Sequence, residues 1–357
     1  MAIDEAVDER TYADYSRPLL WRVMLTREFA VIALLVLVYF YAYGNVANFD
    51  GPLTLYYLFL DIAPILLIAL PMTLVIITGE IDLSVASTMG LTSVMLGILH
   101  HDAGLSIPLA IVGSLVIGSI CGALNGFLVA YVGLPSLAVT IGSLALFRGI
   151  AVGLLGTEAI TDFDQTWTDI ATARIGGESS YPVILIAFAV LAIAFVFLLH
   201  FSPFGRGVYE IGLNDQAARF TGVNVERTKF LLFLMSGAVS AFAGIYYTLR
   251  FESARGDNAE FLELQVIAAV LLGGVSIFGG RGALHGVIAG VLLIGVVSSA
   301  LRLENVSTNI TNIVIGGLLV LSVISSSLLS WVTNLRRRRT PPSSPSSQRS
   351  GRPDAGE

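Results

Sequence analysis

The chain has 357 residues, of which 55% are hydrophobic and only 13% are charged, with a formal net charge of −6. Soluble globular domains carry about 25% charged residues, so the composition excludes an ordinary soluble protein and indicates an all-α polytopic membrane protein. The single cysteine, Cys121, lies in an apolar run, which excludes an intrachain disulfide and predicts a small buried side chain. The first 16 residues are acidic and polar, so we expect no cleavable signal peptide.

Ten apolar runs follow one another along the chain. A helix needs about 20 apolar residues to cross the hydrocarbon core of a bilayer, and these runs approach that length. They predict a transmembrane domain over residues 29–333, with spans at about 29–48, 61–78, 83–99, 107–131, 135–156, 182–201, 230–249, 264–278, 283–301 and 310–331. The second and third spans, and the eighth and ninth, are joined by only a few residues. This leaves open a broken or re-entrant segment in either pair.

Lys and Arg residues set the expected orientation, because they gather in cytoplasmic segments of membrane proteins. They are concentrated in the N-terminal segment 1–28, in the connection 202–229 and in the C-terminal tail 334–357. Both termini are therefore predicted to be cytoplasmic. The tail is rich in Pro and Ser and is predicted to be disordered. The loops 156–181 and 250–263 are expected on the outer side.

The connection 202–229 is a polar, basic segment between two apolar runs. Asn214 is a good N-cap, because its side chain can accept a hydrogen bond from a free backbone N–H of the first turn. Asp215 adds negative charge at the positive end of the helix dipole. Gly222 can adopt the left-handed conformation that ends a helix. These residues predict a short, capped helix in water, which is either a simple loop turn or a docking helix for a soluble partner.

Two further places hold polar side chains in an apolar setting. Asp82 and Ser84 lie at the start of the third predicted span, where either side chain can cap a helix. Arg148 lies within the fifth span, about 20 Å from its start at 1.5 Å per residue. Ionisable groups inside spans mark functional sites by default, but a long basic side chain can also reach the membrane surface. A structural anchor and a wall of a polar pathway both remain open for Arg148.

Small residues recur at helical spacing over residues 267–282, around Gly273 and Gly274. This pattern predicts close helix packing followed by a tight turn at Gly279–Gly282.

The sequence offers no catalytic residues, no metal site and no cofactor site of its own. It contains no Walker A pattern, and its four histidines lie apart without metal-ligand spacing. The spans contain almost no paired carboxylates or histidine relays of the kind that proton-driven carriers use; Asp61 is the nearest candidate and lies at a span end. No nucleic-acid partner is expected.

Three motifs in the same order resemble the permease subunits of bacterial ABC importers, in the branch for ribose, xylose, rhamnose and autoinducer-type solutes. They are the Ile-Asp-Leu-Ser segment 81–84, the connection pattern with Gly212, Asn214, Ala217, Ala218 and Gly222, and the glycine-rich block 267–282. The resemblance covers about residues 71–320. The chain departs from the family at Ala86, where Gly is usual, and at Glu80, where a Gly or another small residue is common.

The resemblance implies a type II ABC importer-like permease with inverted five-span repeats in the bacterial inner membrane. It implies import of a sugar or sugar-like solute that an extracytoplasmic binding protein delivers to a dimer with a second permease copy or paralogue. Residues 206–229 would couple the chain to a separate cytoplasmic ATPase, which binds ATP and Mg. The implied coupling residues are Gly212, Asn214, Asp215, Ala217, Ala218 and Gly222. The candidates for translocation or gating are Asp82, Ser84, Arg148, Gly273 and Gly274.

Two other functions stay open at this point. Within the same superfamily, the chain is compatible with a permease for branched-chain amino acids or nucleosides. From a different class, an ion-gradient-driven secondary transporter would need buried ionisable groups on facing helices. It gives no reason for a capped helix in the cytoplasm.

Overall fold

The computed structural model describes residues 26–177, 181–321 and 324. Within these residues the chain is helical and has no strands, apart from isolated bridges between Ile160 and Ala254 and between Arg174 and Pro182. In the described part of the chain, seven helices are long and apolar enough to cross a membrane: α2 (Arg27–Asn45), α3 (Thr54–Ile77), α5 (Ile107–Ala130), α6 (Ser136–Leu155), α8 (Ile184–Phe201), α11 (Val225–Phe251) and α13 (Leu284–Leu303). The prediction of an all-α polytopic membrane protein is confirmed.

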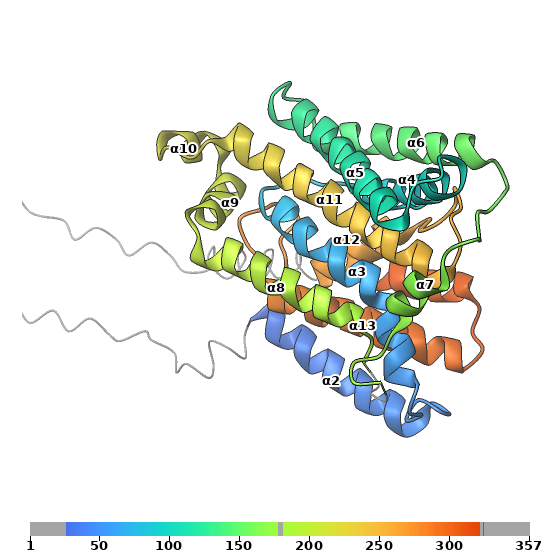
Figure 1. Ribbon diagram of the computed structural model, residues 1–357. Helices are drawn as coiled ribbons and strands as arrows, with labels where there is room; N and C mark the ends of the chain where they lie inside the picture. Colours follow the sequence, from blue (N-terminus) through green and yellow to red (C-terminus); the bar gives the residue numbers. More distant parts are fainter. Residues whose placement is uncertain (1–25, 178–180, 322–323, 325–357) are drawn as a thin grey trace, which may run out of the picture.

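Shorter helices complete the described chain (Figure 1). They are α4 (Val85–Gly97) with the π-helical turn η1 (Ile98–Asp102), α7 (Gln165–Thr172), α9 (Pro203–Leu213), α10 (Asp215–Phe220), α12 (Leu262–Leu272) and a helix at Thr308–Leu321. The predicted tail 334–357, most of the predicted segment 1–28 and the end of the predicted last span lie outside the described residues.

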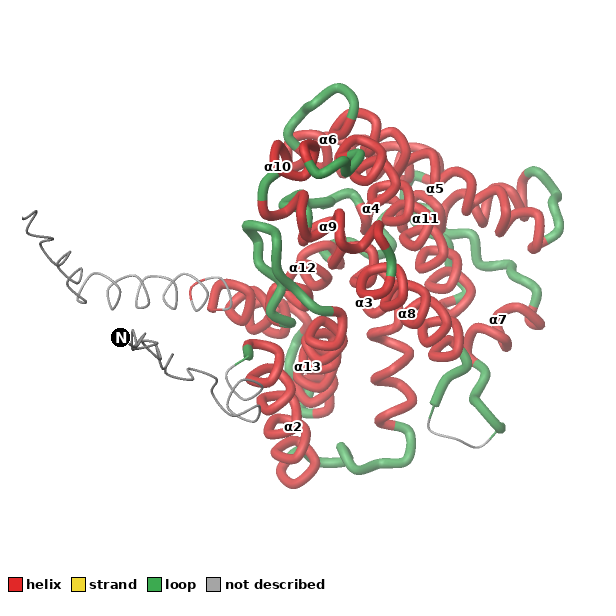
Figure 2. Tube along the Cα trace, turned by 90° about the vertical axis from the view of Figure 1, so that its left-hand side faces the viewer, coloured by secondary structure: helices red, strands yellow, loops and turns green. Residues whose placement is uncertain are grey.

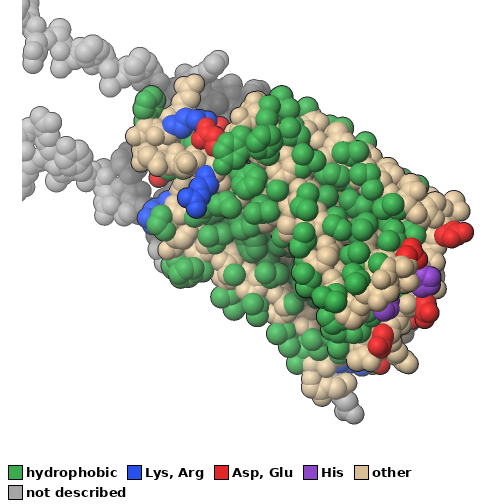
Figure 3. All heavy atoms as spheres, turned by 45° about the horizontal axis from the view of Figure 1, so that its top comes forward, with side chains coloured by type: hydrophobic (Ala, Val, Ile, Leu, Met, Phe, Trp, Pro, Cys, Tyr) green, Lys and Arg blue, Asp and Glu red, His purple; other side chains and the backbone are tan. Residues whose placement is uncertain are grey.

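The bundle has a buried centre and an apolar outer surface. α3 is buried along almost its whole length, whereas most residues of α2, α5, α6 and α8 are not buried. The exposed side chains of these outer helices are mainly Leu, Ile, Val and Phe. Figure 3 shows a broad hydrophobic band on one face of the molecule, with charged side chains gathered towards two opposite ends. Such a band is the surface that a bilayer covers.

We name the two ends of the bundle after the helices found there. At one end, α9 and α10 project beside the start of α11 (Figure 1); this is the α10 end. At the opposite end lie α7 and the connection 252–261 between α11 and α12, and this is the α7 end.

Two helices in the predicted spans 83–99 and 264–278 are short. α4 has 13 residues and continues directly into the five-residue turn η1, whereas α12 has 11 residues. At 1.5 Å per residue, α12 is about 17 Å long, less than the roughly 30 Å of a hydrocarbon core. α3, by contrast, begins at Thr54, seven residues before the predicted start. Asp61 does not end this helix, because its carboxylate forms ion pairs with Arg250 and Arg302.

The two halves of the bundle repeat one pattern in opposite directions. In each half a short helix, α4 or α12, follows a long central helix, α3 or α11, and precedes another long helix. α11 packs against α4 and α5, and α3 packs against α12 and α13. α3 and α11 are antiparallel, because Asp61 near the start of α3 pairs with Arg250 and Glu80 just after its end pairs with Lys229. This is the arrangement expected of inverted repeats.

One close contact between the halves is a seam between α5 and α11. Gly118 and Gly122 of α5 face Gly237 of α11 so closely that a Cβ atom on any of them would lie within 3.0 Å of backbone or side-chain atoms of the other helix. Small residues allow such backbone contact in membrane helices. Cys121 lies beside this seam and is buried, as predicted.

Candidate functional site

The segment at the α10 end consists of two short helices with side-chain caps. The Ser202 hydroxyl accepts a hydrogen bond from the Gly205 N–H at 3.2 Å and starts α9. The Asn214 side chain accepts one from the Ala217 N–H at 3.0 Å and starts α10. The chain leaves α10 through Gly222, whose φ is 90°, and the Val223 N–H donates to the Ala218 carbonyl at 3.0 Å. The predicted N-cap and the predicted left-handed glycine are both confirmed.

Gly212, at the end of α9, lies where three segments meet. A Cβ atom at this position would lie less than 3.0 Å from the Ile77 carbonyl oxygen at the end of α3 and from the Gly280 nitrogen. Those two segments also bind one another, because the Gly280 N–H donates to the Ile77 carbonyl at 2.8 Å. Only glycine fits this junction without moving backbone. α9 is therefore in direct contact with the end of α3 and with the turn 279–282.

Tyr209 adds a second link between α9 and the same turn. Its hydroxyl donates to the Gly282 carbonyl at 2.8 Å. Burial raises the pKa of Tyr209, so the hydroxyl keeps the proton that it donates.

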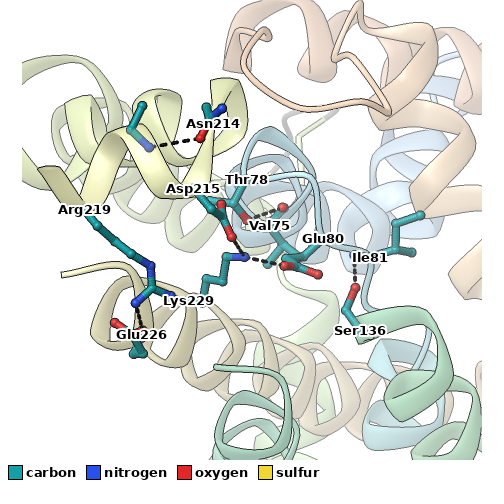
Figure 4. A network of polar contacts seen from close by, with 11 residues as sticks. Val75, Thr78, Glu80, Ile81, Ser136, Asn214, Asp215, Arg219, Glu226 and Lys229 are labelled. Atoms are coloured by element: carbon teal, nitrogen blue, oxygen red, sulfur yellow. Dashed lines mark hydrogen bonds and ion pairs between the residues drawn. The ribbon is translucent and has the colours of Figure 1, made fainter. Parts of the chain in front are cut away.

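Lys229 joins α10 to the turn between α3 and α4 (Figure 4). Its Nζ donates to Glu80 Oε1 and to Asp215 Oδ2, both at 2.6 Å. The Lys229 side chain is only 11% exposed and that of Glu80 17%, so water screens their attraction less than at an open surface. Glu80 is the residue that departs from the family pattern, and its charge has a partner here. Sequence reasoning places Lys229 among the basic residues that flank the short helix, but it did not pair Lys229 with Glu80 or Asp215, because no helical spacing connects it to either carboxylate.

Just beyond Glu80, Asp82 anchors a buried polar network. Its carboxylate accepts hydrogen bonds from the Ser84 N–H at 3.0 Å, from the Ser84 hydroxyl at 2.6 Å and from the Ser236 hydroxyl of α11 at 2.8 Å. Asn125 of α5 donates to the Ser84 oxygen at 2.8 Å. Ser84 occupies the N-cap position of α4, yet its side chain makes no capping bond to the helix. The network thus connects the start of α4 to α5 and α11.

The surface around α10 exposes three large apolar side chains. Phe220 at the end of α10 is 93% exposed, Leu213 71% and Phe278 82%. Ion pairs flank them, including one between Arg219 and Glu226. Exposed apolar side chains with charged groups around them are typical of protein interaction sites.

Gly273 and Gly274 end α12 against α13 and α2. A Cβ atom at Gly273 would lie within 3.0 Å of backbone atoms of Val287 and Gly286. Gly274 has a φ of 95° and faces the side chains of Arg27 and Glu28. The predicted close packing and the tight turn after it are confirmed, since Gly279, Gly280 and Gly282 all have positive φ.

Arg148 lies away from the α10 end, where it holds the connection 252–261. Its Nη1 donates to the carbonyls of Gly256 and Asn258, each at 2.7 Å, and its Nη2 to the Ala86 carbonyl of α4 at 3.2 Å. The guanidinium therefore ties α6 to α4 and to a connection in the other half of the chain. It does not meet Asp82 and Ser84, with which sequence reasoning had grouped it.

We expect Arg148→Met to loosen the connection 252–261. The change removes charge-assisted hydrogen bonds to two carbonyls of that connection, each worth about 1.5–3 kcal/mol, and keeps the apolar stem. Hydrogen–deuterium exchange should increase in residues 252–261 and stay unchanged in α9 and α10. Equal exchange in both proteins would contradict the anchoring role.

Within the described residues, no three His, Cys, Asp or Glu side chains gather closely enough to hold a metal ion.

Residues 54–323 match the family described as branched-chain amino acid transport system / permease component, and the chain belongs to this family of multi-pass membrane permeases. The chain is 37% identical over 268 residues to the autoinducer 2 import system permease protein LsrD of Yersinia enterocolitica, covering 73% of this chain and 80% of that protein. It is 34% identical over 286 residues to LsrD of Photorhabdus luminescens, covering 76% and 85%. With LsrD of Photorhabdus temperata the identity is 33% over 328 residues, covering 88% and 97%. No solved structure matches the chain.

Proposed function

We propose that this chain is the membrane-spanning permease subunit of an ATP-driven ABC importer in the bacterial inner membrane, and that it translocates a sugar-like solute of the autoinducer 2 type. The observation that carries the proposal is α10. This capped helix exposes Phe220 to solvent and is bound through Asp215 and Lys229 to the turn between α3 and α4. The relatives named as autoinducer 2 import permeases support the solute class.

In this function the α10 end faces the cytoplasm. Basic residues gather there, namely Arg206, Arg219, Arg227, Lys229 and Arg281, as the positive-inside rule requires. A separate ATPase, which binds ATP and Mg, docks on α10. An extracytoplasmic binding protein delivers the solute at the α7 end, and a second permease copy or paralogue completes the translocation pathway.

The contacts of α10 give a physical route for coupling. When the ATPase subunits close, they displace α10, and the displacement reaches Glu80 through Lys229 and the end of α3 through Gly212. The turn 78–84 then carries it to the Asp82 network at the start of α4. ATP can bias the two states only if these contacts differ between them. The roles of Gly212, Asn214, Asp215, Ala217, Ala218 and Gly222 in coupling belong to this proposal.

The family description favours branched-chain amino acids as a second candidate substrate class. Uptake of labelled leucine and of autoinducer 2 by the same reconstituted transporter distinguishes the two. The ion-gradient alternative would need Asp61 as its ionisable group, but the Asp61 carboxylate is held in ion pairs with Arg250 and Arg302.

Phe220→Asp tests the docking of the ATPase. Because the Phe220 side chain is 93% exposed, the change should leave the fold intact while it places a charge at the centre of the docking surface. We expect the amount of ABC ATPase that co-purifies with the tagged chain to fall at least about tenfold, as for an interface hot spot worth 1.4 kcal/mol or more.

The matched control is Ile170→Asp, an equally severe change on the exposed face of α7, where the side chain is 52% exposed. It should retain the ATPase. If Phe220→Asp retains the ATPase as fully as the control does, α10 is not the docking site.

A further inference from the structure

A pocket of about 520 Å³ opens at the α7 end, between the end of α11, the connection 252–261 and the first turn of α12. Its volume lies in the usual range for small-molecule sites. Polar side chains line it together with two aromatic rings: Arg255, Asp257, Asn258, Glu260, Gln265, Tyr247 and Phe251. None of the motifs singled out in the sequence includes these residues.

The backbone around this pocket is held in a costly conformation. Glu252, Ala259 and Phe261 all have positive φ, at 52°, 61° and 65°, although none of them is glycine. Such residues cost about 1–3 kcal/mol each and persist only where the surroundings fix them. Here the surroundings are the bridge between Ile160 and Ala254 and the two hydrogen bonds from Arg148. The connection is therefore rigid before any ligand arrives.

Asn258 is the buried polar group of the pocket. Its side-chain amide donates to the Ser93 hydroxyl at 2.8 Å and to the Ser253 carbonyl at 2.9 Å. Both donors are thus used, and the residue is only 9% exposed. Its side-chain oxygen has no hydrogen-bond partner among the described residues, which leaves one fixed acceptor for a ligand.

The other polar groups supply both donors and acceptors with little net charge. Arg255 binds Asp257 in a two-pronged ion pair, with distances of 2.9 Å and 2.8 Å. Hydrogen bonds from Arg255 hold the pKa of Asp257 below its usual value, so the carboxylate stays ionised and accepts. Glu260 and Gln265 add another carboxylate and an amide, and the rings of Tyr247 and Phe251 add apolar faces.

We infer that this pocket is the first binding subsite of the permease for a neutral, hydroxyl-rich solute of monosaccharide size. A hydroxyl group both donates and accepts, and so matches a mixture of carboxylates, amides and a guanidinium. The aromatic rings cover the C–H face of such a solute. An amino acid would instead bring a full negative charge, and the one guanidinium that lines the pocket, Arg255, is already paired with Asp257. The inference rests on the proposed function, which places the α7 end on the outer side where the solute arrives.

A second pocket lies beside the first. Gln265 lines this second pocket of about 290 Å³, which is formed by α12 and the helix 308–321 and is mostly apolar. α12 is one of the two short helices that occupy matching positions in the halves. In transporters with inverted repeats, interrupted helices of this kind border the substrate site. Gln265 therefore borders both pockets.

Direct binding to the purified full-length chain tests the subsite. Saturation-transfer NMR in nanodiscs, with ribose, autoinducer 2 and leucine as probes, should detect the two hydroxylated probes and not leucine. Gln265→Leu and Glu260→Ala should each raise the Kd about tenfold, because each removes a hydrogen bond to the solute. Glu158→Ala, an exposed carboxylate outside the pocket, should leave the Kd unchanged. Binding of leucine alone, or equal Kd values in all variants, would overturn the inference.

Uptake by the reconstituted transporter separates this inference from the function on which it rests. Gln265→Leu should raise KM for the solute about tenfold while uptake stays dependent on ATP. If the wild type takes up the solute with ATP and Gln265→Leu has the same KM, the subsite is refuted while the proposed function stands. If the wild type, assembled with its ATPase, transports none of the probes, the proposed function is refuted. The binding data then decide whether the pocket takes a sugar.

Discussion

Gly212→Ala is expected to abolish ATP-dependent uptake by the assembled transporter. The added methyl group would lie less than 3.0 Å from the Ile77 carbonyl oxygen and from the Gly280 nitrogen. Both are backbone atoms, so no side-chain rotation relieves the overlap. The end of α9 must move away from α3, and the junction between the three segments opens. Uptake of labelled solute into proteoliposomes and stimulation of the ATPase measure the loss.

Gly142→Ala is the matched control, because a Cβ atom there meets nothing within 4 Å. Gly142 also lies within a helix, α6, so alanine should be neutral or slightly stabilising. Both variants should insert into the membrane at wild-type levels. Normal uptake by Gly212→Ala would mean that the contact between α9 and the end of α3 plays no part in coupling.

Lys229→Met is expected to reduce uptake at least about tenfold and to lower the melting temperature of the protein. The change leaves the carboxylates of Glu80 and Asp215 facing each other without the cation that holds both at 2.6 Å. Leaving a largely buried charge without its partner destabilises the fold much more than removing a whole ion pair. Each lost charge-assisted hydrogen bond lowers the free energy of unfolding by about 1.5–3 kcal/mol. α10 would then separate from the turn 78–84.

A triple variant distinguishes stability from coupling. Lys229→Met combined with Glu80→Gln and Asp215→Asn removes every charge of the bridge, so the melting temperature should recover toward that of the wild type. Uptake should stay low, because the contact between α10 and the turn 78–84 is still weakened. Recovery of uptake together with stability would show that the bridge only stabilises the fold.

Much of the α10 end could be predicted from local sequence. The cap at Asn214 and the left-handed Gly222 depend on residues within one or two helical turns, and both occur as expected. The partners across the structure could not be found in this way. Glu80 and Lys229 are 149 positions apart, and their contact follows from the packing of α3 on α11. Spans that are apolar on all sides do not indicate which face meets which neighbour.

α12 illustrates the same limit of local patterns. Residues 264–278 are apolar enough to suggest a full span, because a helix buried among other helices needs no polar face. What ends α12 early is the glycine pair Gly273–Gly274, which also serves close packing. For α3 the predicted span was too short at its start. Asp61, as a lone carboxylate, suggested a helix boundary, whereas ion pairs with two arginines from other helices allow it to lie within α3.

The burial of Cys121 makes this chain a natural background for thiol chemistry. It is the only cysteine in the sequence, and it is 6% exposed beside the α5–α11 seam. A bulky maleimide that stays in water has no target in the folded protein. A cysteine introduced at residue 214 would therefore be the sole reactive thiol. Whether the reagent labels it in intact cells would show which compartment surrounds α10.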